Sequence, residues 1–374
     1  MPRYANMLVK GMKERGHDVA LWQPDPLFYK MPLPGSFKKW LAYIDQYIVF
    51  PMRVRNRLRK EPADAVFVFT DHALGPYVPL VKKRSHVIHC HDFLAQRSAR
   101  GQFVENPTGF TGRLYQKYIH RGYSKGKNFI SISNKTKQDL HEFLKTLPEL
   151  SEVVYNGLNQ DFKKTKVEEA RTALSKHVNI DLSAGYVLHV GGNLWYKNRQ
   201  GVIEIFNAFQ NKTDSPVQLL MIGSAPSPEL TAYVAQLSSK EKIHFLSAID
   251  DNWLKTAYAG ASVFLFPSIA EGFGWPIAEA MASGCQVITT NEAPMTEVAG
   301  NAASLIEKRP SVKVSVNQWA IESAEVLENV LLRSVKEQDE AKENGLINIK
   351  RFDAGATLDK IEAIYLRIHA KTKK

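Results

Sequence analysis

Short apolar runs alternate with helical stretches along almost the whole chain, and this alternation limits the fold more than any other feature. The runs are continuous and rich in β-branched and aromatic residues, as in strands buried on both faces. We therefore expect an α/β protein with two doubly wound domains, each built on a parallel sheet. The expected strands are DVALWQ, DAVFVFT, HVIHC, NFISIS and EVVYN in the first half, and YVLHVG, QLLMIG, KIHFLS, SVFLFPS, QVITT and AASLIE in the second.

A polar stretch at 163–177 marks the expected boundary between the two domains. A chain of 374 residues is long enough for two domains, each with its own core. We expect the first domain over residues 1–162 and the second over residues 163–353. The last helix, over residues 354–374, follows the second sheet and has no further strand to lead into.

The net charge of +11 is unevenly distributed. Residues 1–160 hold 25 Lys and Arg against 13 Asp and Glu, a net charge of +12, whereas residues 161–374 hold 24 against 25, a net charge of −1. The basic half indicates an anionic partner: a membrane surface, a nucleic acid or a phosphorylated substrate. Nucleic acid is disfavoured because no helix-turn-helix, RRM or zinc pattern accompanies the charge.

No apolar run approaches the length needed to span a bilayer, and the N-terminus MPRYANMLVKGMKERG lacks a secretory signal. We therefore expect a cytoplasmic protein. The two cysteines, Cys90 and Cys285, cannot build a disulfide framework and have no metal-ligand spacing. Both are expected to be buried small hydrophobes, and no metal site is expected.

The segment FKKWLAYIDQYIVFPMRVRNRLRK at 37–60 mixes Trp, Tyr, Phe and Ile with seven Lys or Arg residues. Such a composition suits an amphipathic segment that lies on anionic lipid, in peripheral contact with the inner face of a membrane. The alternative is an ordinary helix with a solvated basic face. Pro51 favours that alternative because it interrupts the helical pattern.

The segment EGFGWPIAE at 271–279 follows the expected strand SVFLFPS, at the strand end where α/β proteins bind ligands. Its two glycines allow close approach of the backbone to a ligand, and Pro276 suits the first turn of a helix. The amides at the start of that helix favour anions, so Glu271 and Glu279 are candidates to bind hydroxyl groups beside a phosphate. The alternative is a tight turn with two solvated glutamates.

The segment VLHVGGNLWYKNRQG at 187–201 again places a glycine turn between a strand and a helix. Lys197 and Arg199 are placed to reach a diphosphate across a cleft, and Asn193 to form a hydrogen bond. The glycine pair is neither GxGxxG nor a Walker sequence, so the pattern alone does not identify a nucleotide site. Taken alone, the pattern favours a capped turn with two surface cations over a nucleotide site.

In the first half, HVIHCHDFLAQRSARG places His91 and Asp92 at the end of a strand and before a basic loop. A histidine at a strand end is usually structural. The His-Asp pair is also a candidate for catalysis or for contact with an acceptor at the ligand edge of the sheet. It is not a convincing metal site, because no cluster with ligand spacing completes one.

Taken together, these motifs resemble the retaining glycosyltransferases of family 4 (glycosyl transferases group 1), which have the GT-B fold. Glu271 and Glu279 are separated by seven residues, as in the EX7E signature of that family. The resemblance extends to VGGNLWYKNRQGVIEIFNAF, FISISNKTKQDLHEF, VVYNGLNQDF and HDFLAQRSARG, and so covers nearly the whole chain. It implies two Rossmann-like domains across a cleft, the first binding the acceptor and the second the nucleotide sugar. It also implies that the last helix packs back on the first domain.

The resemblance also implies a role for each candidate residue. Glu271 holds the donor sugar, Lys197 neutralises the diphosphate, and Glu279 binds the ribose hydroxyls. His91 and Asp92 position the acceptor hydroxyl. The implied catalytic set is Glu271, His91, Asp92 and Lys197, and the implied donor-binding set is Gly191, Gly192, Asn193, Lys197, Arg199, Gly272, Phe273, Gly274 and Glu279.

The implied activity is the transfer of a hexose, with retention, from a nucleotide-diphosphate sugar to a glycan or lipid-linked acceptor in polysaccharide biosynthesis. The nucleotide sugar is a co-substrate, and no other cofactor and no metal is expected because cations and helix N-termini stabilise the leaving diphosphate. Two alternatives stay open. One is a nucleotide-sugar-binding protein or catalytically impaired partner in glycan assembly, and the other is a nucleotide-sugar epimerase of the same fold.

The chain departs from the family pattern at two points. Gly192 stands where many relatives carry an arginine, so either Arg199 supplies the second cation or Lys197 works alone. The N-terminal MPRYANMLVKGM already has the pattern of the first helix. We therefore expect the first strand of the fold and its glycine loop to be missing, which concerns acceptor binding more than the donor site.

Overall fold

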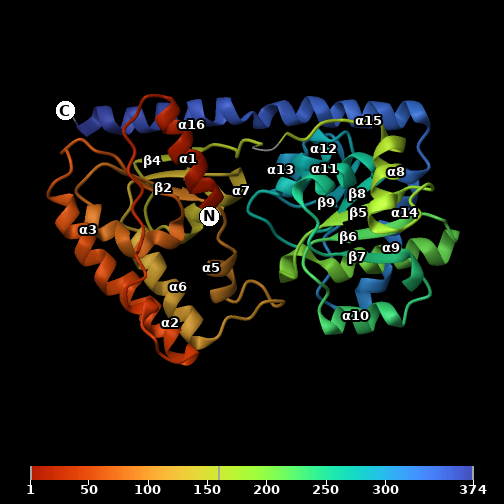
Figure 1. Cartoon of the computed structure of the whole chain (residues 1–374), viewed down its shortest axis with the longest axis horizontal. Helices are drawn as coiled ribbons and strands as arrows, with labels where there is room; N and C mark the ends of the chain where they lie inside the picture. Colours follow the sequence, from red (N-terminus) through yellow and green to blue (C-terminus); the bar gives the residue numbers. More distant parts are fainter. Residues whose placement is uncertain (1, 159–160, 373–374) are drawn as a thin grey trace.

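The computed structural model describes residues 2–158 and 161–372. It contains two parallel sheets in two lobes (Figure 1), one with the strand order β1-β2-β3-β4 and one with the order β10-β9-β8-β5-β6-β7. The α/β class and the two doubly wound sheets are confirmed. The first lobe comprises α1 (Pro2–Glu14), η1 (Phe28–Lys30), α2 (Gly35–Ile44), the π-helix η2 (Asp45–Val49), α3 (Phe50–Leu58), β1 (Phe67–Phe69), η3 (His72–Tyr77), α4 (Val78–Val81), β2 (His86–Cys90), α5 (Leu94–Ala99), α6 (Phe110–Tyr123), β3 (Asn128–Ser131), α7 (Asn134–Phe143) and β4 (Leu150–Val153).

The second lobe contains the longer sheet, and the helices between its strands cover both faces (Figure 1). Its elements are α8 (Val167–Val178), β5 (Tyr186–Val190), η4 (Trp195–Lys197), α9 (Arg199–Thr213), β6 (Gln218–Ile222), α10 (Pro228–Ala235), η5 (Lys240–Lys242), β7 (Ile243–Leu246), α11 (Asp251–Gly260), β8 (Val263–Phe266), α12 (Trp275–Ala282), β9 (Val287–Thr290), α13 (Met295–Ala299), β10 (Ala303–Ile306), α14 (Lys313–Leu331), α15 (Val335–Asn348) and η6 (Ile349–Phe352). Helix α16 (Ala354–Thr372) follows and returns to the first lobe.

Each sheet has an apolar core on both faces, because successive residues of a strand point to opposite sides. In β2, Val87 belongs to the cluster that contains Ile130, whereas Ile88 belongs to the cluster that contains Phe129. All five residues of β2 and all four of β8 are buried. Both cysteines are buried as well. The continuous apolar runs of the sequence therefore correspond to central strands covered on two sides.

One expected strand, DVALWQ at 18–23, is absent: this described segment forms no ladder. Val19 packs against the core cluster that contains Leu8, while Leu21 is 48% exposed. The ring of Trp22 lies edge-on to Phe67, with 5.8 Å between ring centroids. The segment is thus held by side-chain contacts and not by a neighbouring strand, and among the described residues helix α1 comes before β1 without a strand between them.

The two C-terminal helices run along one side of both lobes, with α15 over the second and α16 over the first (Figure 1). Ile361, Ile364 and Ile368 of α16 lie in the same core cluster as Leu8 of α1 and Val87 of β2. Helix α16 therefore completes one face of the first sheet. The last two residues of the expected helix, 373–374, lie outside the described residues.

Candidate active site

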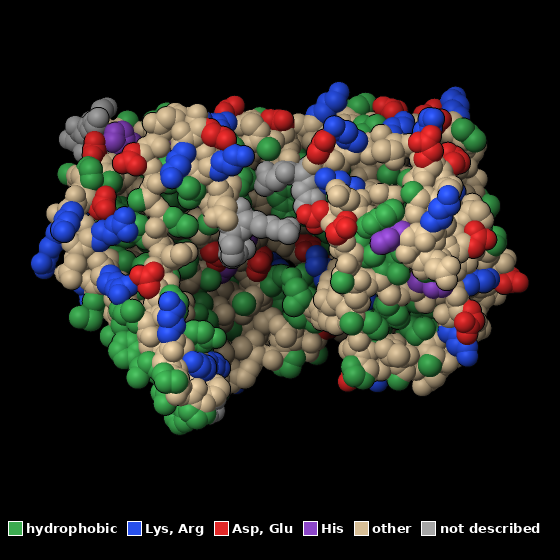
Figure 2. Space-filling model, in the orientation of Figure 1, with side chains coloured by type: hydrophobic (Ala, Val, Ile, Leu, Met, Phe, Trp, Pro, Cys, Tyr) green, Lys and Arg blue, Asp and Glu red, His purple; other side chains and the backbone are tan. Residues whose placement is uncertain are grey.

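The carboxyl ends of the two sheets meet between the lobes, where the surface is hollowed (Figure 2). One close contact lies between Gly272, after β8, and His91, after β2. A Cβ atom placed on Gly272 would lie 2.1 Å from the carbonyl oxygen of His91. The hydroxyl of Ser133, after β3, donates a hydrogen bond to the carbonyl of Gly272 at 3.0 Å. The glycine turn of the second lobe thus rests directly on the strand ends of the first.

Glu271 is not a solvated glutamate. Its Oε1 accepts hydrogen bonds from Lys197 Nζ at 2.8 Å and from Ser268 Oγ at 2.9 Å. The Lys197 and Glu271 side chains are only 14% and 8% exposed. Burial raises the pKa of the Glu271 carboxyl above its usual value, while Lys197 and the Ser268 hydroxyl act to lower that pKa. A buried ion pair therefore joins the segments 187–201 and 271–279.

The turn that follows Glu271 requires glycine at two positions for different reasons. Gly272 has no room for a side chain because the first lobe touches it. Gly274 has a φ of +105° and is the residue before helix α12, so a side chain would strain the backbone. Phe273 is buried, and its ring packs against Phe352 at 5.4 Å between centroids. Its side chain belongs to the core, which leaves its backbone for any contact with a ligand.

Glu279 lies in the second turn of α12 and is directed at the neighbouring helix α11. Its Oε2 accepts a hydrogen bond from the hydroxyl of Tyr258 at 2.9 Å. Burial and the nearby carboxylate raise the pKa of the Tyr258 hydroxyl well above its usual value, so this hydroxyl remains a donor. The two glutamates of the motif are thus each fixed by a different partner, one by Lys197 and the other by Tyr258.

The turn at 191–193 is packed against the parallel turn after β6. A Cβ on Gly223 would lie 2.2 Å from the carbonyl oxygen of Gly191, and a Cβ on Gly192 would lie 3.2 Å from Ser224 Oγ. The amide nitrogen of the Asn193 side chain donates to the carbonyl of Ala225 at 2.7 Å. These contacts fix the shape of both turns at the carboxyl edge of the second sheet.

Arg199 is buried, at 5% exposure, and is therefore not one of the two surface cations of the alternative interpretation of this segment. Its Nη1 donates to the carbonyl of Ser224 at 2.9 Å and also contacts Asn193 Oδ1. Its Nε and Nη2 are buried without a partner among the described residues, as is Nε2 of His189. Arg199 therefore joins the two turns. Its guanidinium lies 5.3 Å from the centroid of the Phe245 ring, and two of its nitrogens have no hydrogen-bond partner in the described part of the chain.

On the first lobe, His91 Nε2 donates to the carbonyl of Thr70 at 2.9 Å, and the ring of Tyr4 meets the His91 ring edge-on. The Asp92 carboxylate accepts the amide of Leu94 at 3.0 Å. Burial lowers the pKa of His91 and raises that of Asp92. His91 is thus a neutral imidazole at neutral pH, with its proton on Nε2.

Two further residues, Asp71 and His72, belong to this edge and were missed in the sequence. They follow β1 as His91 and Asp92 follow β2, and the two strands are parallel neighbours. Burial raises the pKa of Asp71 and lowers that of His72 to about 4. The dipeptide DH directly after the expected strand DAVFVFT was the available signal, since neighbouring parallel strands end at the same edge.

A carboxylate of the second lobe also binds the start of helix α7 in the first lobe. Glu297 of α13 accepts the backbone amides of Asn134 and Lys135, at 2.7 and 2.8 Å. The first-turn amides of a helix attract negative charge. The α7 N-terminus, which Ser133 also caps through the amide of Thr136, is therefore part of the contact between the lobes.

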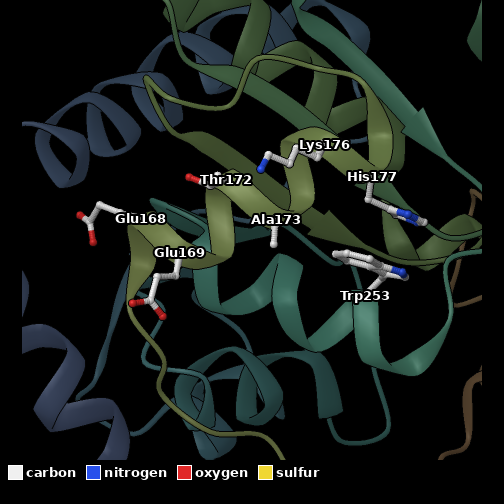
Figure 3. A pocket seen from close by; sticks show the side chains of 7 residues that line it. All are labelled: Glu168, Glu169, Thr172, Ala173, Lys176, His177 and Trp253. Carbon is white, nitrogen blue, oxygen red and sulfur yellow. The ribbon is translucent and has the colours of Figure 1, made fainter.

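A separate cavity of about 710 Å³ lies on the outside of the second lobe, between α8 and α11 (Figure 3). The ring of His177 stacks on Trp253 there, with 4.0 Å between ring centroids. No predicted site residue lines this cavity, so it is not part of the site between the sheets. Its lining residues are Glu168, Glu169, Thr172, Ala173, Lys176, His177 and Trp253.

Within the described ranges, no helix is both long enough and apolar enough to traverse a bilayer.

Comparison with known proteins gives matches over both lobes. The sequence model described as "Glycosyltransferase Family 4" matches residues 1–162, and the model described as "Glycosyl transferases group 1" matches residues 170–345. The chain is 29% identical over 203 residues to O-antigen chain mannosyltransferase RfbU of Salmonella typhimurium, which covers 53% of this chain and 52% of that protein. It is 22% identical to the MMP alpha-(1->4)-mannosyltransferase of Mycolicibacterium hassiacum, over 79% of each chain. The matched part spans about half the length of RfbU.

Two solved structures show the same fold. The crystal structure of WaaG, a glycosyltransferase involved in lipopolysaccharide biosynthesis, has a TM-score of 0.67 at 19% identity and covers 97% of this chain and 95% of that one. The structure of HepE from Anabaena in complex with UDP and glucose has a TM-score of 0.67 at 18% identity, over 95% and 88% of the two chains. With both lobes matched by family models, the chain belongs to the group 1 glycosyltransferases of family 4, which have the GT-B fold.

Proposed function

We propose that this protein is a retaining glycosyltransferase. It moves a sugar from a nucleotide-diphosphate sugar to a glycan or lipid-linked acceptor, without a metal ion. In this proposal residues 1–162 bind the acceptor, residues 163–353 bind the donor, and the helix at 354–374 returns to the first domain.

The buried Lys197–Glu271 ion pair carries the proposal. It lies at the carboxyl edge of the second sheet, next to the N-terminus of α12. When the bond between the anomeric carbon and the phosphate oxygen breaks, negative charge grows on the leaving diphosphate. The ammonium of Lys197 and the amides of the glycine turn stabilise that charge. Glu271 holds the ammonium in place and accepts hydrogen bonds from the sugar hydroxyls.

The remaining donor residues act around this pair. Glu279 binds the ribose hydroxyls, and its bond to the Tyr258 hydroxyl fixes the direction of its carboxylate. Arg199 holds the turn of Gly191, Gly192 and Asn193 against the neighbouring turn, and its unpartnered N–H groups favour an anion nearby. In this proposal the diphosphate binds between the turn at 191–193 and the start of α12.

His91 and Asp92 face the glycine turn from the acceptor side and orient the acceptor hydroxyl. The hydroxyl oxygen forms a bond to the anomeric carbon on the face that the phosphate leaves. The hydroxyl proton passes to the leaving phosphate oxygen, so no separate base and no covalent intermediate is needed. Attack on the front face retains the anomeric configuration.

The relatives support this donor and acceptor chemistry. HepE was crystallised with UDP and glucose and with UDP-glucose, and RfbU is named as an O-antigen chain mannosyltransferase. By analogy, we propose a nucleotide-activated hexose as donor and a growing polysaccharide as acceptor. We also propose that the enzyme works in the cytoplasm, at the inner face of a membrane. The net charge of +12 over residues 1–160 suits an anionic surface there.

The test is a transfer assay with nucleotide sugars and acceptor glycans, run with and without EDTA. We expect transfer that survives EDTA and a product whose anomeric configuration, measured by NMR, matches that of the donor. The Lys197→Ala variant should turn over roughly a hundredfold more slowly or worse. An inverted product would refute the retaining mechanism, and near-normal turnover of the variant would remove the role of Lys197.

A further inference from the structure

The end of the first lobe carries exposed apolar side chains that the transfer reaction does not use. In Figure 2 hydrophobic side chains gather there, at the lower left, beside Lys and Arg. Trp40 of α2 is 66% exposed and Phe110 of α6 is 69% exposed. Exposed apolar clusters of this kind mark interaction sites. We call this surface the tip patch and define it by Phe37, Trp40, Ile48, Met52, Phe110, Leu114 and Tyr118, all between 48% and 69% exposed.

The tip patch is made of two stripes held side by side. Phe110, Leu114 and Tyr118 recur every four residues and so share one face of α6. The other stripe comes from α2, η2 and α3. Tyr47 of η2 joins the two, because its hydroxyl is hydrogen-bonded to that of Tyr115 at 2.7 Å and its ring meets the Tyr118 ring at 5.8 Å between centroids.

The loop beside α2 is also fixed, which keeps its apolar side chains at the edge of the patch. Asp45 accepts the backbone amides of Phe28 and Tyr29, both at 2.9 Å. The ammonium of Lys38 donates to the carbonyls of Tyr29 and Met31, at 2.9 and 2.8 Å. Tyr29 and Met31 are 47% and 44% exposed. The buried Asp45 therefore serves to order an exposed apolar loop.

The charges around the tip patch are almost all positive. Asp45 is the only acidic residue between positions 26 and 60, and positions 106 to 138 contain none. Long cationic side chains beside exposed aromatic rings suit the boundary of an anionic bilayer, where the rings enter the headgroup layer and the cations meet phosphates. A second copy of this chain would bring like charges together instead. The exposed cations of these segments are Lys39, Arg53, Arg55, Arg57, Arg59, Lys60, Arg113, Lys117 and Arg121. Two of them form ion pairs at the border of the patch, Arg53 with Asp25 and Arg57 with Glu61.

We propose that the tip patch docks this protein on an anionic lipid bilayer, with Trp40 and Phe110 entering the headgroup layer. The inference deepens the proposed function, because a lipid-linked acceptor would be presented at that surface. The contact is made by the stripe of α6 and the stripe of α2, η2 and α3, with the loop beside α2 at its border. Docking can fail while the transfer reaction stands.

The experiment is flotation of the full chain with vesicles of phosphatidylcholine that contain about one third phosphatidylglycerol. The wild type should bind these vesicles and bind pure phosphatidylcholine vesicles far less. Trp40→Ser and Phe110→Ser should each weaken vesicle binding about tenfold, because each removes the free energy gained by burying one aromatic side chain. The matched control is Val335→Ser in the second lobe, at a residue that is 76% exposed and outside the patch. It should bind like the wild type.

Equal vesicle affinity of both patch variants and the wild type would overturn the proposal, as would equal affinity for the two vesicle types. A wild-type dimer that Trp40→Ser dissociates, without vesicle binding, would assign the patch to a second copy and overturn the proposal too.

An unchanged melting midpoint shows that each variant is folded. Both patch variants should still transfer sugar to a water-soluble acceptor at the wild-type rate. If the wild type binds vesicles but transfers no sugar, the proposed function fails and the docking surface stands.

Discussion

Replacement of Lys197 by Met removes one half of a buried ion pair and keeps the length of the side chain. The Glu271 carboxylate, 8% exposed, would then retain only the Ser268 hydroxyl from its present polar partners. Breaking a buried pair by removing one partner costs about 3–5 kcal/mol of folding free energy. Lys197→Met should therefore be among the most destabilising single substitutions in the second lobe.

The loss should depend on pH in a defined direction. Burial already raises the pKa of Glu271, and without the ammonium of Lys197 that pKa rises further. Glu271 of the variant then binds a proton more readily in the folded state than in the unfolded state. The free energy of unfolding of the variant therefore falls as pH rises from the usual pKa of a glutamate to the raised pKa of Glu271. The deficit relative to the wild type should be largest at about pH 8 and shrink toward about pH 5.

A second substitution separates stability from chemistry. Lys197→Met with Glu271→Gln removes both charges of the pair, so most of the lost folding free energy should return, while sugar transfer stays at least about a hundredfold below the wild type. The measurement is urea unfolding at several pH values together with a transfer assay. The control is Lys336→Met, which breaks an exposed pair with Glu340, where the side chains are 87% and 63% exposed, and should leave stability unchanged. Wild-type stability of Lys197→Met at about pH 8 would refute the buried pair.

Other predictions concern the contact between the lobes and the buried histidines. Gly272→Ala should push the lobes apart, raising the radius of gyration in X-ray scattering and lowering kcat/KM at least about tenfold; Gly109→Ala, where a Cβ meets nothing within 4 Å, is its control, and unchanged scattering of the first variant would contradict the contact. Glu297→Gln should destabilise the protein by about 1 kcal/mol, because it removes the charge at the start of α7, and should do so less at high salt; a loss that salt does not change would argue against a charge effect. Burial lowers the pKa of His189 to about 3, so this residue stays neutral in the folded state while the unfolded chain takes up its proton below about pH 6.5. The free energy of unfolding should accordingly fall by about 1.4 kcal/mol per pH unit for this residue between about pH 6 and pH 4, and His189→Gln should show a shallower slope.

Much of the fold could be predicted because central parallel strands have continuous apolar sequences. SVFLFPS became the fully buried β8, and HVIHC became β2. DVALWQ has the same composition but forms no ladder, since composition does not say whether a neighbouring strand is available. The pattern in the sequence therefore identified central and edge strands alike, but it did not exclude an apolar segment that has no strand to pair with.

The placement of a candidate residue was predictable where that residue lies within one strand-turn-helix unit, as Glu271 does between β8 and α12. What the sequence could not show were the contacts between units. The burial of Arg199 depends on a turn 25 residues away in the chain. The place of Asp71 and His72 beside His91 depends on the order of strands in the sheet. The bond from Glu297 to α7 depends on how the two lobes meet, which no local pattern records.

The donor site around Lys197 and Glu271 can be tested by the melting midpoint of the wild type with UDP, GDP, ADP and their sugar conjugates, each with and without EDTA. A ligand at a hundred times its dissociation constant adds about 2.7 kcal/mol, which moves the midpoint by several degrees. We predict a shift with one nucleotide family that survives EDTA and disappears when Lys197→Met and Glu271→Gln are combined. No shift with any of these ligands, or a shift that the double variant retains, would contradict the proposed site.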